Sequence, residues 1–229
     1  MKTTEKLQVL DGTAIKLIAM VIMVVDHVGD NFFPQAVWMR AVGRLALPLF
    51  AFCVAEGYIH THDRKKYLLR MGLFALVSEL PFDLLTAGRL EFSHQNVMAT
   101  FFLSICALML YDRITAAAPS ALRRALGVGA VIVLAAAATL LGTDYGFFAV
   151  GLVFIFYIYR GYSPLVRILS AAAFHALVRN MGIYWWGLGA FAVLLCYNGK
   201  KGRGLKWLFY VFYPGHMLLL YFIKTLIRA

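Results

Sequence analysis

Nine apolar stretches, most of them about as long as a membrane-spanning helix, fill nearly all of this 229-residue chain. A helix that crosses the hydrocarbon core of a bilayer needs about 20 mostly apolar residues. The segments between the stretches are short and offer no candidate for a domain outside the membrane. The sequence therefore predicts an all-α, polytopic transmembrane bundle that forms a single domain over residues 1–229. The predicted spans are 13–30, 38–59, 66–86, 95–113, 125–142, 145–160, 164–180, 184–198 and 205–225.

The sixth and eighth stretches are short, which leaves a count of eight spans open. Pro48, Pro81 and Pro214 each lie within a predicted span. A proline inside a helix removes a hydrogen bond and frees a carbonyl group, so we expect kinks at these positions. Kinks of this kind favour a central polar cavity.

The composition excludes a soluble or disordered chain, because 62% of the residues are apolar and only 14% are charged. The formal net charge of +11 raises nucleic acid as a partner. The basic residues, however, form short clusters between the apolar stretches, which is the pattern that orients membrane proteins. We therefore expect no nucleic-acid partner. The clusters are Arg64-Lys65-Lys66, Arg123-Arg124 and Lys200-Lys201-Gly202-Arg203.

The same clusters predict the orientation of the chain. If the N-terminus lies in the cytoplasm, fourteen basic residues, Lys2 and Lys6 among them, fall at inner ends or loops and five fall at outer ends. Positive charge gathers on the cytoplasmic side of membrane proteins. The N-terminus is thus predicted inside and the C-terminus outside.

Ionisable side chains inside the predicted spans are the candidates for function, because each costs roughly 2.5–3.5 kcal/mol at the bilayer centre on insertion scales. With the orientation above, nine polar residues fall in the outer half of the membrane or at its outer rim. We expect them to form one cluster below the outer surface. They are Asp26, His27, Arg44, Glu79, Asp83, His94, Asn96, His175 and Arg179.

Lys16 and His27 are eleven residues apart and lie on nearly the same face of one predicted helix, about 16 Å apart along its axis. Met20 and Met23 lie between them. This stripe could line a passage for an extended anionic ligand, with its phosphates near Lys16 and its reactive end near His27. Alternatively, Lys16 reaches the inner headgroups and His27 is a buried imidazole with its hydrogen bonds satisfied.

Asp26 is adjacent to His27, so the two side chains point about 100° apart and Asp26 is not expected to orient the ring. Asp26 is expected to pair with Arg40 or Arg44, which share a helix face and act either as counter-ions or as an anion clamp. The partner that orients His27 must come from another helix. By depth in the membrane, the candidates are Glu79, Asp83 and His94.

Imidazole transfers protons near neutral pH, which makes His27 the predicted general base. Asn96 or Arg44 could stabilise the oxyanion of an acyl-transfer intermediate, and His216 is a second candidate acid or base. No His-x-x-x-His or Glu-x-x-His arrangement falls within a predicted span. We therefore expect no metal site.

A set of short motifs between about residue 10 and residue 220 closely resembles the TraX family of membrane proteins. The motifs are dense in the first hundred residues, whereas residues 115–200 add little beyond hydrophobicity. They are Ile18-Ala19-Met20, Asp26-His27-x-Gly29, Gly43-Arg44-x-Ala46-x-Pro48, Glu56-Gly57-Tyr58, Tyr67-x-x-Arg70, Ser78-Glu79-x-Pro81-Phe82-Asp83, Gln95-Asn96-Val97 and Phe212-Tyr213-Pro214-x-His216.

This resemblance implies an acyltransferase. The family is named for a protein that N-acetylates a conjugative pilin, and it is similar to a wider superfamily of membrane acyltransferases. Many O-acyltransferases of that superfamily carry an arginine and, ten residues later, a catalytic histidine. The matching pair here is Lys16 and His27, and lysine keeps the charge but loses the bidentate fork of arginine.

The predicted activity is the transfer of an acyl group, acetyl first, from cytoplasmic acyl-CoA to an acceptor at the extracytoplasmic face of a prokaryotic inner membrane. The acceptor would be a protein N-terminus, a sugar or a glycopolymer, and membrane lipids would surround the chain. His27 would act as general base or transient acyl carrier, with its electrostatics set by Glu79, Asp83 or Asp26. The acceptor or oxyanion would meet Arg44, Asn96, His94 or His216, and the CoA phosphates would meet Lys16, Arg64, Lys65 and Lys66.

Two alternatives belong to other classes. In a proton-coupled transporter, Asp26, His27, Glu56, Glu79 and His216 would form a relay. In a structural or assembly protein, the buried charges would only fix the register of the helices. A relay should cross the membrane, whereas the acidic and histidine residues gather on one side and the inner half holds mainly cations, which favours a polyanionic donor.

Overall fold

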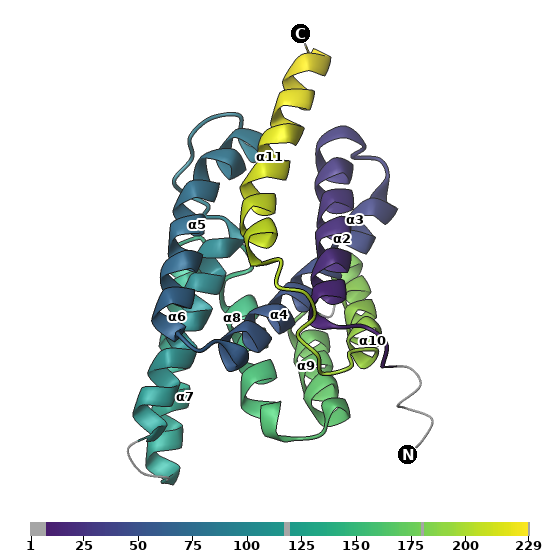
Figure 1. The fold of residues 1–229 in the computed structure, drawn as a ribbon. Helices are drawn as coiled ribbons and strands as arrows, with labels where there is room; N and C mark the ends of the chain where they lie inside the picture. Colours follow the sequence, from purple (N-terminus) through teal and green to yellow (C-terminus); the bar gives the residue numbers. More distant parts are fainter. Residues whose placement is uncertain (1–7, 117–119, 180, 229) are drawn as a thin grey trace.

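All nine predicted stretches are helical in the computed structural model, which describes residues 8–116, 120–179 and 181–228 (Figure 1). Lys2, Lys6 and residue 180 lie outside these ranges. The described chain contains no strand, only isolated bridges between Leu10 and Tyr197 and between Gln95 and Thr143. The helices are α2 Gly12–Phe32, α3 Val37–Gly43, α4 Ala46–His60, α5 Arg64–Thr86, α6 Val97–Ala116, α7 Ala121–Leu140, α8 Gly146–Ile158, η1 Tyr159–Gly161, α9 Pro164–Val178, η2 Gly182–Leu188, α10 Gly189–Leu195 and α11 Lys206–Arg228.

Several helix starts follow from the local sequence. The side chains of Asp11 and Asp63 accept hydrogen bonds from the amides of the third residues after them, at 2.8 and 2.9 Å, and so cap α2 and α5. Ser120 caps α7 in the same way at 3.2 Å. Ser163 caps α9 and precedes a proline at the first helical position. Aspartate and serine favour these positions because their oxygens satisfy free amides of the first turn.

Five helical stretches are long and apolar enough to cross a membrane: Gly12–Phe32, Val37–His60, Val97–Ala116, Ala121–Leu140 and Trp207–Ile227. The chain is therefore a helical membrane protein. Among the other four predicted spans, α5 is 23 residues long but carries several charged side chains, and the stretches that contain α8, α9 and α10 are shorter apolar helices. For these four, helix formation is confirmed, and crossing of the membrane stays a prediction.

The three prolines act differently from one another. The predicted span 38–59 is divided at Arg44 and Leu45, and Pro48 lies in the first turn of α4, where amides have no helical partner in any case. That proline therefore needs no kink. Pro81 and Pro214 do lie inside α5 and α11, as expected.

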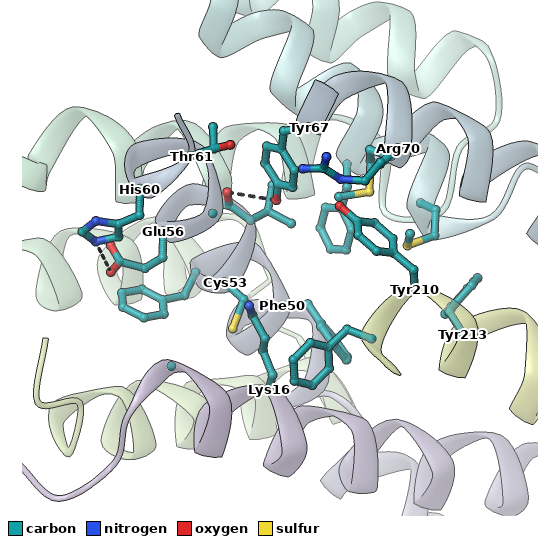
Figure 2. A pocket seen from close by; sticks show the side chains of 18 of the residues that line it. Lys16, Phe50, Cys53, Glu56, His60, Thr61, Tyr67, Arg70, Tyr210 and Tyr213 are labelled. Atoms are coloured by element: carbon teal, nitrogen blue, oxygen red, sulfur yellow. Dashed lines mark hydrogen bonds and ion pairs between the residues drawn. The ribbon is translucent and has the colours of Figure 1, made fainter. Parts of the chain in front are cut away.

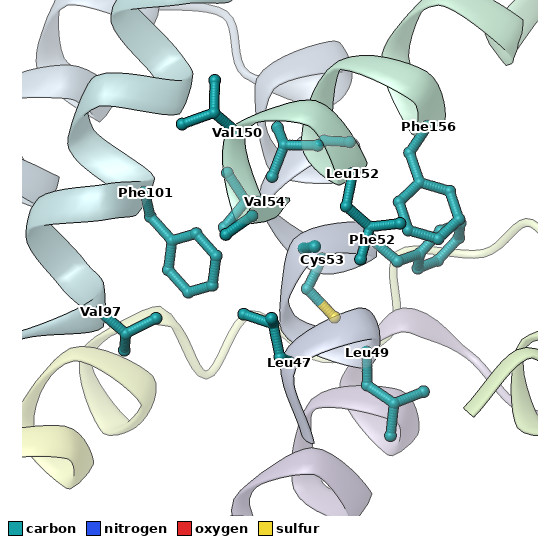
Figure 3. Packing of buried hydrophobic residues seen from close by; sticks show 14 of the residues in the cluster. Leu47, Leu49, Phe52, Cys53, Val54, Val97, Phe101, Val150, Leu152 and Phe156 are labelled. Atoms are coloured by element: carbon teal, nitrogen blue, oxygen red, sulfur yellow. The ribbon is translucent and has the colours of Figure 1, made fainter. Parts of the chain in front are cut away.

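The core surrounds α4, which crosses the middle of the bundle (Figure 1). Figure 3 shows Phe52 and Val54 of α4 packed with Phe101 of α6 and with Leu152 and Phe156 of α8. Both α4 and α8 are buried on nearly every side. A helix that is apolar all round belongs in such a position.

Candidate active site

Asp26, in the second half of α2, forms ion pairs with two arginines. Its carboxylate lies 2.9 Å from Nη1 of Arg40 and 2.8 Å from Nη2 of Arg44, and only a tenth of the Asp26 and Arg44 side chains is exposed. The predicted pairing is thus confirmed with both arginines. Gly43 makes it possible, because a Cβ there would overlap the Asp26 carboxylate. Of the two proposed roles for the arginines, the counter-ion role matches this geometry.

His27 pairs with His216, a residue 189 positions later on α11. Nδ1 of His27 lies 2.9 Å from Nε2 of His216, and the ring planes differ by 3°. Nδ1 of His216 lies 2.8 Å from the carbonyl oxygen of Phe212. The partner that orients His27 is therefore His216 and none of the residues suggested by depth alone.

This chain of contacts assigns the tautomers of the neutral pair. A carbonyl oxygen can only accept, so Nδ1 of His216 carries the proton and donates it to Phe212. Nε2 of His216 then accepts from Nδ1 of His27. It follows that the unprotonated nitrogen of His27 is Nε2, and no hydrogen bond within the described ranges occupies it. His27 has the free lone pair that a general base requires.

The expected single polar cluster is divided, and Glu79, Asn96, Asp83 and His94 form their hydrogen bonds away from His27. Glu79 accepts from Asn96, whose side-chain amide also donates to the carbonyl of Ala75 at 2.8 Å. The Asn96 oxygen caps α6 by accepting from Met98 at 2.9 Å. Both amide protons of Asn96 are thus already donated within the protein. A catalytic role for Glu79 or Asn96 stays a prediction.

Asp83 lies in the last turn of α5, and His94 lies in the loop that follows this helix. The buried carboxylate of Asp83 accepts from the backbone amide of Glu91 at 3.0 Å, which closes the turn. His94 is exposed, and its Nδ1 lies 2.9 Å from the carbonyl of Ser93. Within the described residues, neither side chain forms a hydrogen bond with His27, and their catalytic roles also stay predictions.

Two neighbouring cavities lie beside α2, one lined by Lys16 and the other by His27. The larger, of about 240 Å³, is lined mainly by apolar and aromatic side chains but also by Lys16, Arg70 and Lys201 (Figure 2). The smaller, of about 50 Å³, is lined by Asp26, His27 and Tyr145. The two share five wall residues, which are Met23, Phe50, Val97, Phe101 and Tyr213. The Lys16–His27 stripe therefore borders two adjacent cavities that share part of their walls.

A comparison with protein families completes this description of the site. The TraX protein family matches residues 11–224, which includes the Asp26-His27 and Phe212-to-His216 motifs. The chain belongs to the TraX family. The family assignment suggested by the motifs is thus confirmed over nearly the whole sequence.

Two curated proteins are similar to this TraX family member. The "Probable fimbrial assembly protein FimC, serogroup H1" of Dichelobacter nodosus is 27% identical, over 93% of this chain and 96% of that protein. The "Uncharacterized protein RP591" of Rickettsia prowazekii (strain Madrid E) is 27% identical, over 40% of this chain and 34% of that protein. No solved structure matches the chain.

Of the basic residues predicted to meet the CoA phosphates, only some line the larger cavity of this TraX chain. Lys16 lines it, with Nζ 5.0 Å from the ring centre of Phe209. Arg64 instead donates to Asp112 at 2.6 Å, and neither Lys65 nor Lys66 is among the cavity-lining residues. The structure adds Arg70 and Lys201 to the cavity wall; the sequence placed Arg70 within a predicted span and Lys201 in a predicted inner loop, without indicating that either faces a cavity.

Tyr145 is a site residue that no sequence pattern indicates. It precedes α8 with φ = 64°, and it is the sole non-glycine residue with positive φ in the described ranges. Side chains rarely adopt this conformation unless the surrounding structure enforces it. Nη1 of Arg44 donates to the Tyr145 hydroxyl oxygen at 3.4 Å, so the hydroxyl proton is free to point into the smaller cavity.

Asp144 lines the same cavity from the loop between α7 and α8. Its backbone carbonyl accepts from the Thr100 hydroxyl at 2.6 Å, and its amide donates to Gln95 at 2.8 Å. Burial raises the pKa of the Asp144 carboxyl to about 6, against the opposing attraction of Arg44. These contacts fix the loop that presents Tyr145.

Proposed function

We propose that this TraX family member is an acyltransferase of the prokaryotic inner membrane. It would take an acyl group, acetyl first, from acyl-CoA on the cytoplasmic side and transfer it to an amine or hydroxyl acceptor at the outer face. The observation that carries the proposal is the free Nε2 of His27, held by His216 beside the cavities that lead from Lys16.

The proposed chemistry uses this nitrogen as a general base. Nε2 of His27 removes the proton from the acceptor nitrogen or oxygen as that atom attacks the thioester carbonyl. The new bond to the acceptor forms, and the carbonyl oxygen becomes an oxyanion. When the intermediate collapses, the C–S bond breaks and the CoA thiolate recovers the proton from His27. The step needs no other reactant.

The oxyanion would be stabilised by Tyr145 supported by Arg44. Because Arg44 donates to the Tyr145 oxygen, the tyrosine proton can be donated to a reacting group in the smaller cavity. Asn96 is less suited to this role because its amide protons are already donated. Asp26 would keep Arg44 in place rather than act on substrate.

The family relationship supports a protein N-terminus as the first acceptor to examine. TraX is named for a pilin acetylase, and the related Dichelobacter nodosus protein is named as a probable fimbrial assembly protein. We therefore include a peptide with a free N-terminus, an amino sugar and a hydroxyl-bearing glycan in the acceptor panel.

The test uses the purified full chain in lipid nanodiscs with acetyl-CoA and each acceptor, and it measures thiol release together with the acetylated product. Wild type should release CoA with at least one acceptor, and His27→Ala should lower the rate by about 10²–10⁴-fold. His62→Gln, which changes an exposed histidine in the loop before α5, is the matched control and should keep the wild-type rate. Equal rates for wild type and His27→Ala would refute the proposal, as would a lack of product with every acceptor.

A further inference from the structure

Three cations line the larger cavity without a carboxylate to balance them. Lys16 contacts the Phe209 ring, Nε of Arg70 is buried without a hydrogen-bond partner, and Lys201 lines the cavity from an exposed loop. None of the three forms an ion pair among residues 8–116, 120–179 and 181–228. Figure 2 shows Lys16 on α2 and Arg70 on α5 extending into the cavity from opposite sides.

The one carboxylate that lines this cavity in the described chain is already neutralised. Glu56 lies 2.7 Å from Nη1 of Arg167 and 3.3 Å from Nε2 of His60, and it accepts from the Tyr197 hydroxyl at 2.8 Å. Glu56 therefore offers little negative charge to the three cations.

Lys16 and Arg70 each lie near the start of a helix. Lys16 is four residues from the start of α2 and Arg70 six residues from the start of α5, or about 6 and 9 Å along the helices. The loop of Lys201 is fixed to the start of α2, because the Gly12 amide donates to the Lys200 carbonyl at 2.8 Å and the Thr13 hydroxyl to that of Arg203 at 2.7 Å. The positive site is thus built by segments far apart in sequence.

Uncompensated cations within a membrane protein are unfavourable unless an anion joins them. We propose that Lys16, Arg70 and Lys201 bind the diphosphate of the acyl-CoA donor while its pantetheine arm occupies the cavity. The inference rests on the function proposed above and adds Arg70 and Lys201 to it. Arginine and lysine are the side chains that bind phosphate most strongly.

The dimensions match this arrangement. About thirteen bonds separate the thiol sulfur of CoA from the diphosphate phosphorus that carries the pantetheine arm. An extended chain advances about 1.2 Å per bond, so the arm reaches about 16 Å. Lys16 and His27 are about 16 Å apart along α2. Pockets for complete drug-sized ligands have volumes of about 300–1,000 Å³. The cavity of about 240 Å³ suits the arm, with the adenosine left outside the mouth.

The test is calorimetric titration of the full chain in neutral-lipid nanodiscs with CoA, dephospho-CoA and pantetheine. Wild type should bind CoA and dephospho-CoA within about threefold of each other, and pantetheine at least about tenfold more weakly. Arg70→Gln and Lys201→Gln should each weaken CoA binding by about tenfold and leave pantetheine binding unchanged. Arg124→Gln, which removes an exposed cation at the start of α7, is the matched control and should bind CoA like wild type.

The outcomes separate this inference from the function on which it rests. If wild type bound no CoA, the proposed donor would be wrong. If it bound CoA but neither variant weakened binding, only the diphosphate site would be refuted. If wild type bound dephospho-CoA as weakly as pantetheine, the proposal that the three cations bind the diphosphate would be refuted. Variants that lose co-purifying anionic phospholipid at unchanged CoA affinity would reassign the cations to a lipid headgroup. Lys201 lies on an exposed loop, so its variant should remain folded.

Discussion

Nδ1 of His27 lies 2.9 Å from Nε2 of His216, and this contact leaves Nε2 of His27 as the free nitrogen of the pair. The arrangement resembles in its logic the acid-base pairs of hydrolases, in which a second group fixes the tautomer of the catalytic imidazole. Here the second group is itself an imidazole. It can also share the charge when His27 takes up a proton.

We predict that His216→Ala lowers kcat for acyl transfer by about 10- to 100-fold, less than the 10²–10⁴-fold expected for loss of the base itself. The affinity for CoA should not change, because His216 does not line the larger cavity. His216→Gln should recover part of the rate, since its side-chain oxygen can accept from Nδ1 of His27. The measurement is a pH–rate profile of each variant, and a profile of His216→Ala with the wild-type shape and rate would exclude a positioning role.

We predict that Tyr145→Phe lowers kcat by about 10²–10³-fold at unchanged KM, as removal of one oxyanion donor does. The substitution removes only the hydroxyl that receives a bond from Arg44 and faces the smaller cavity. Tyr162→Phe, at an exposed tyrosine after η1, is the control and should match wild type. A Tyr145→Phe enzyme with wild-type kcat would show that the oxyanion is stabilised by other groups.

Gly43→Ala should destabilise the protein by about 3 kcal/mol, because the added methyl would displace Asp26 and separate a buried ion pair. The same substitution at Gly129, in α7, meets no atom within 4 Å and should be neutral or stabilise by up to about 1 kcal/mol. Unfolding in detergent would measure both. Equal stabilities would mean that Asp26 moves aside without loss.

The sequence was sufficient to predict the helices but not their lateral arrangement. All nine apolar stretches became helices because length and hydropathy are local properties. Ionisable side chains within a stretch can be read directly from the sequence, which made His27 and His216 candidates. Which helices are neighbours depends on packing, and depth alone suggested Glu79, Asp83 and His94 as partners of His27, where the structure has His216.

The sequence was likewise insufficient to predict which basic residues face the larger cavity. Charge clusters predict the side of the membrane, so Arg64, Lys65 and Lys66 appeared equivalent to Lys201. Only the fold distinguishes Arg64, which contacts Asp112, from Lys201, whose loop is bound to the start of α2. Tyr145 had no sequence signal, since its positive φ is a property of the folded backbone.

Asp144→Asn should stabilise the protein at pH 8 and have no such effect at pH 4. The folded pKa of about 6 exceeds the unfolded value of about 3.9, so the folded state binds the proton more tightly. The stability contribution is full below the unfolded value and is lost as the pH rises to 6 and beyond. The difference in Tm between variant and wild type should therefore grow between pH 4 and pH 8. A difference independent of pH would contradict the raised pKa.

Acyl-CoA can reach the larger cavity only if that cavity opens to the cytoplasm, and cysteine labelling can establish the side of the membrane on which it opens. In a background with Cys53, Cys106 and Cys196 replaced by alanine, Arg89→Cys places a thiol in the loop after α5, and Gly204→Cys places one in the loop bound to the start of α2. An impermeant maleimide on intact cells should label residue 89, and residue 204 only after permeabilisation. Both positions are exposed, so burial would not limit the reaction. The reverse pattern would place Lys16, Arg70 and Lys201 at the outer face, where acyl-CoA is not supplied. The His27–His216 pair would then need a donor that arrives from the other side.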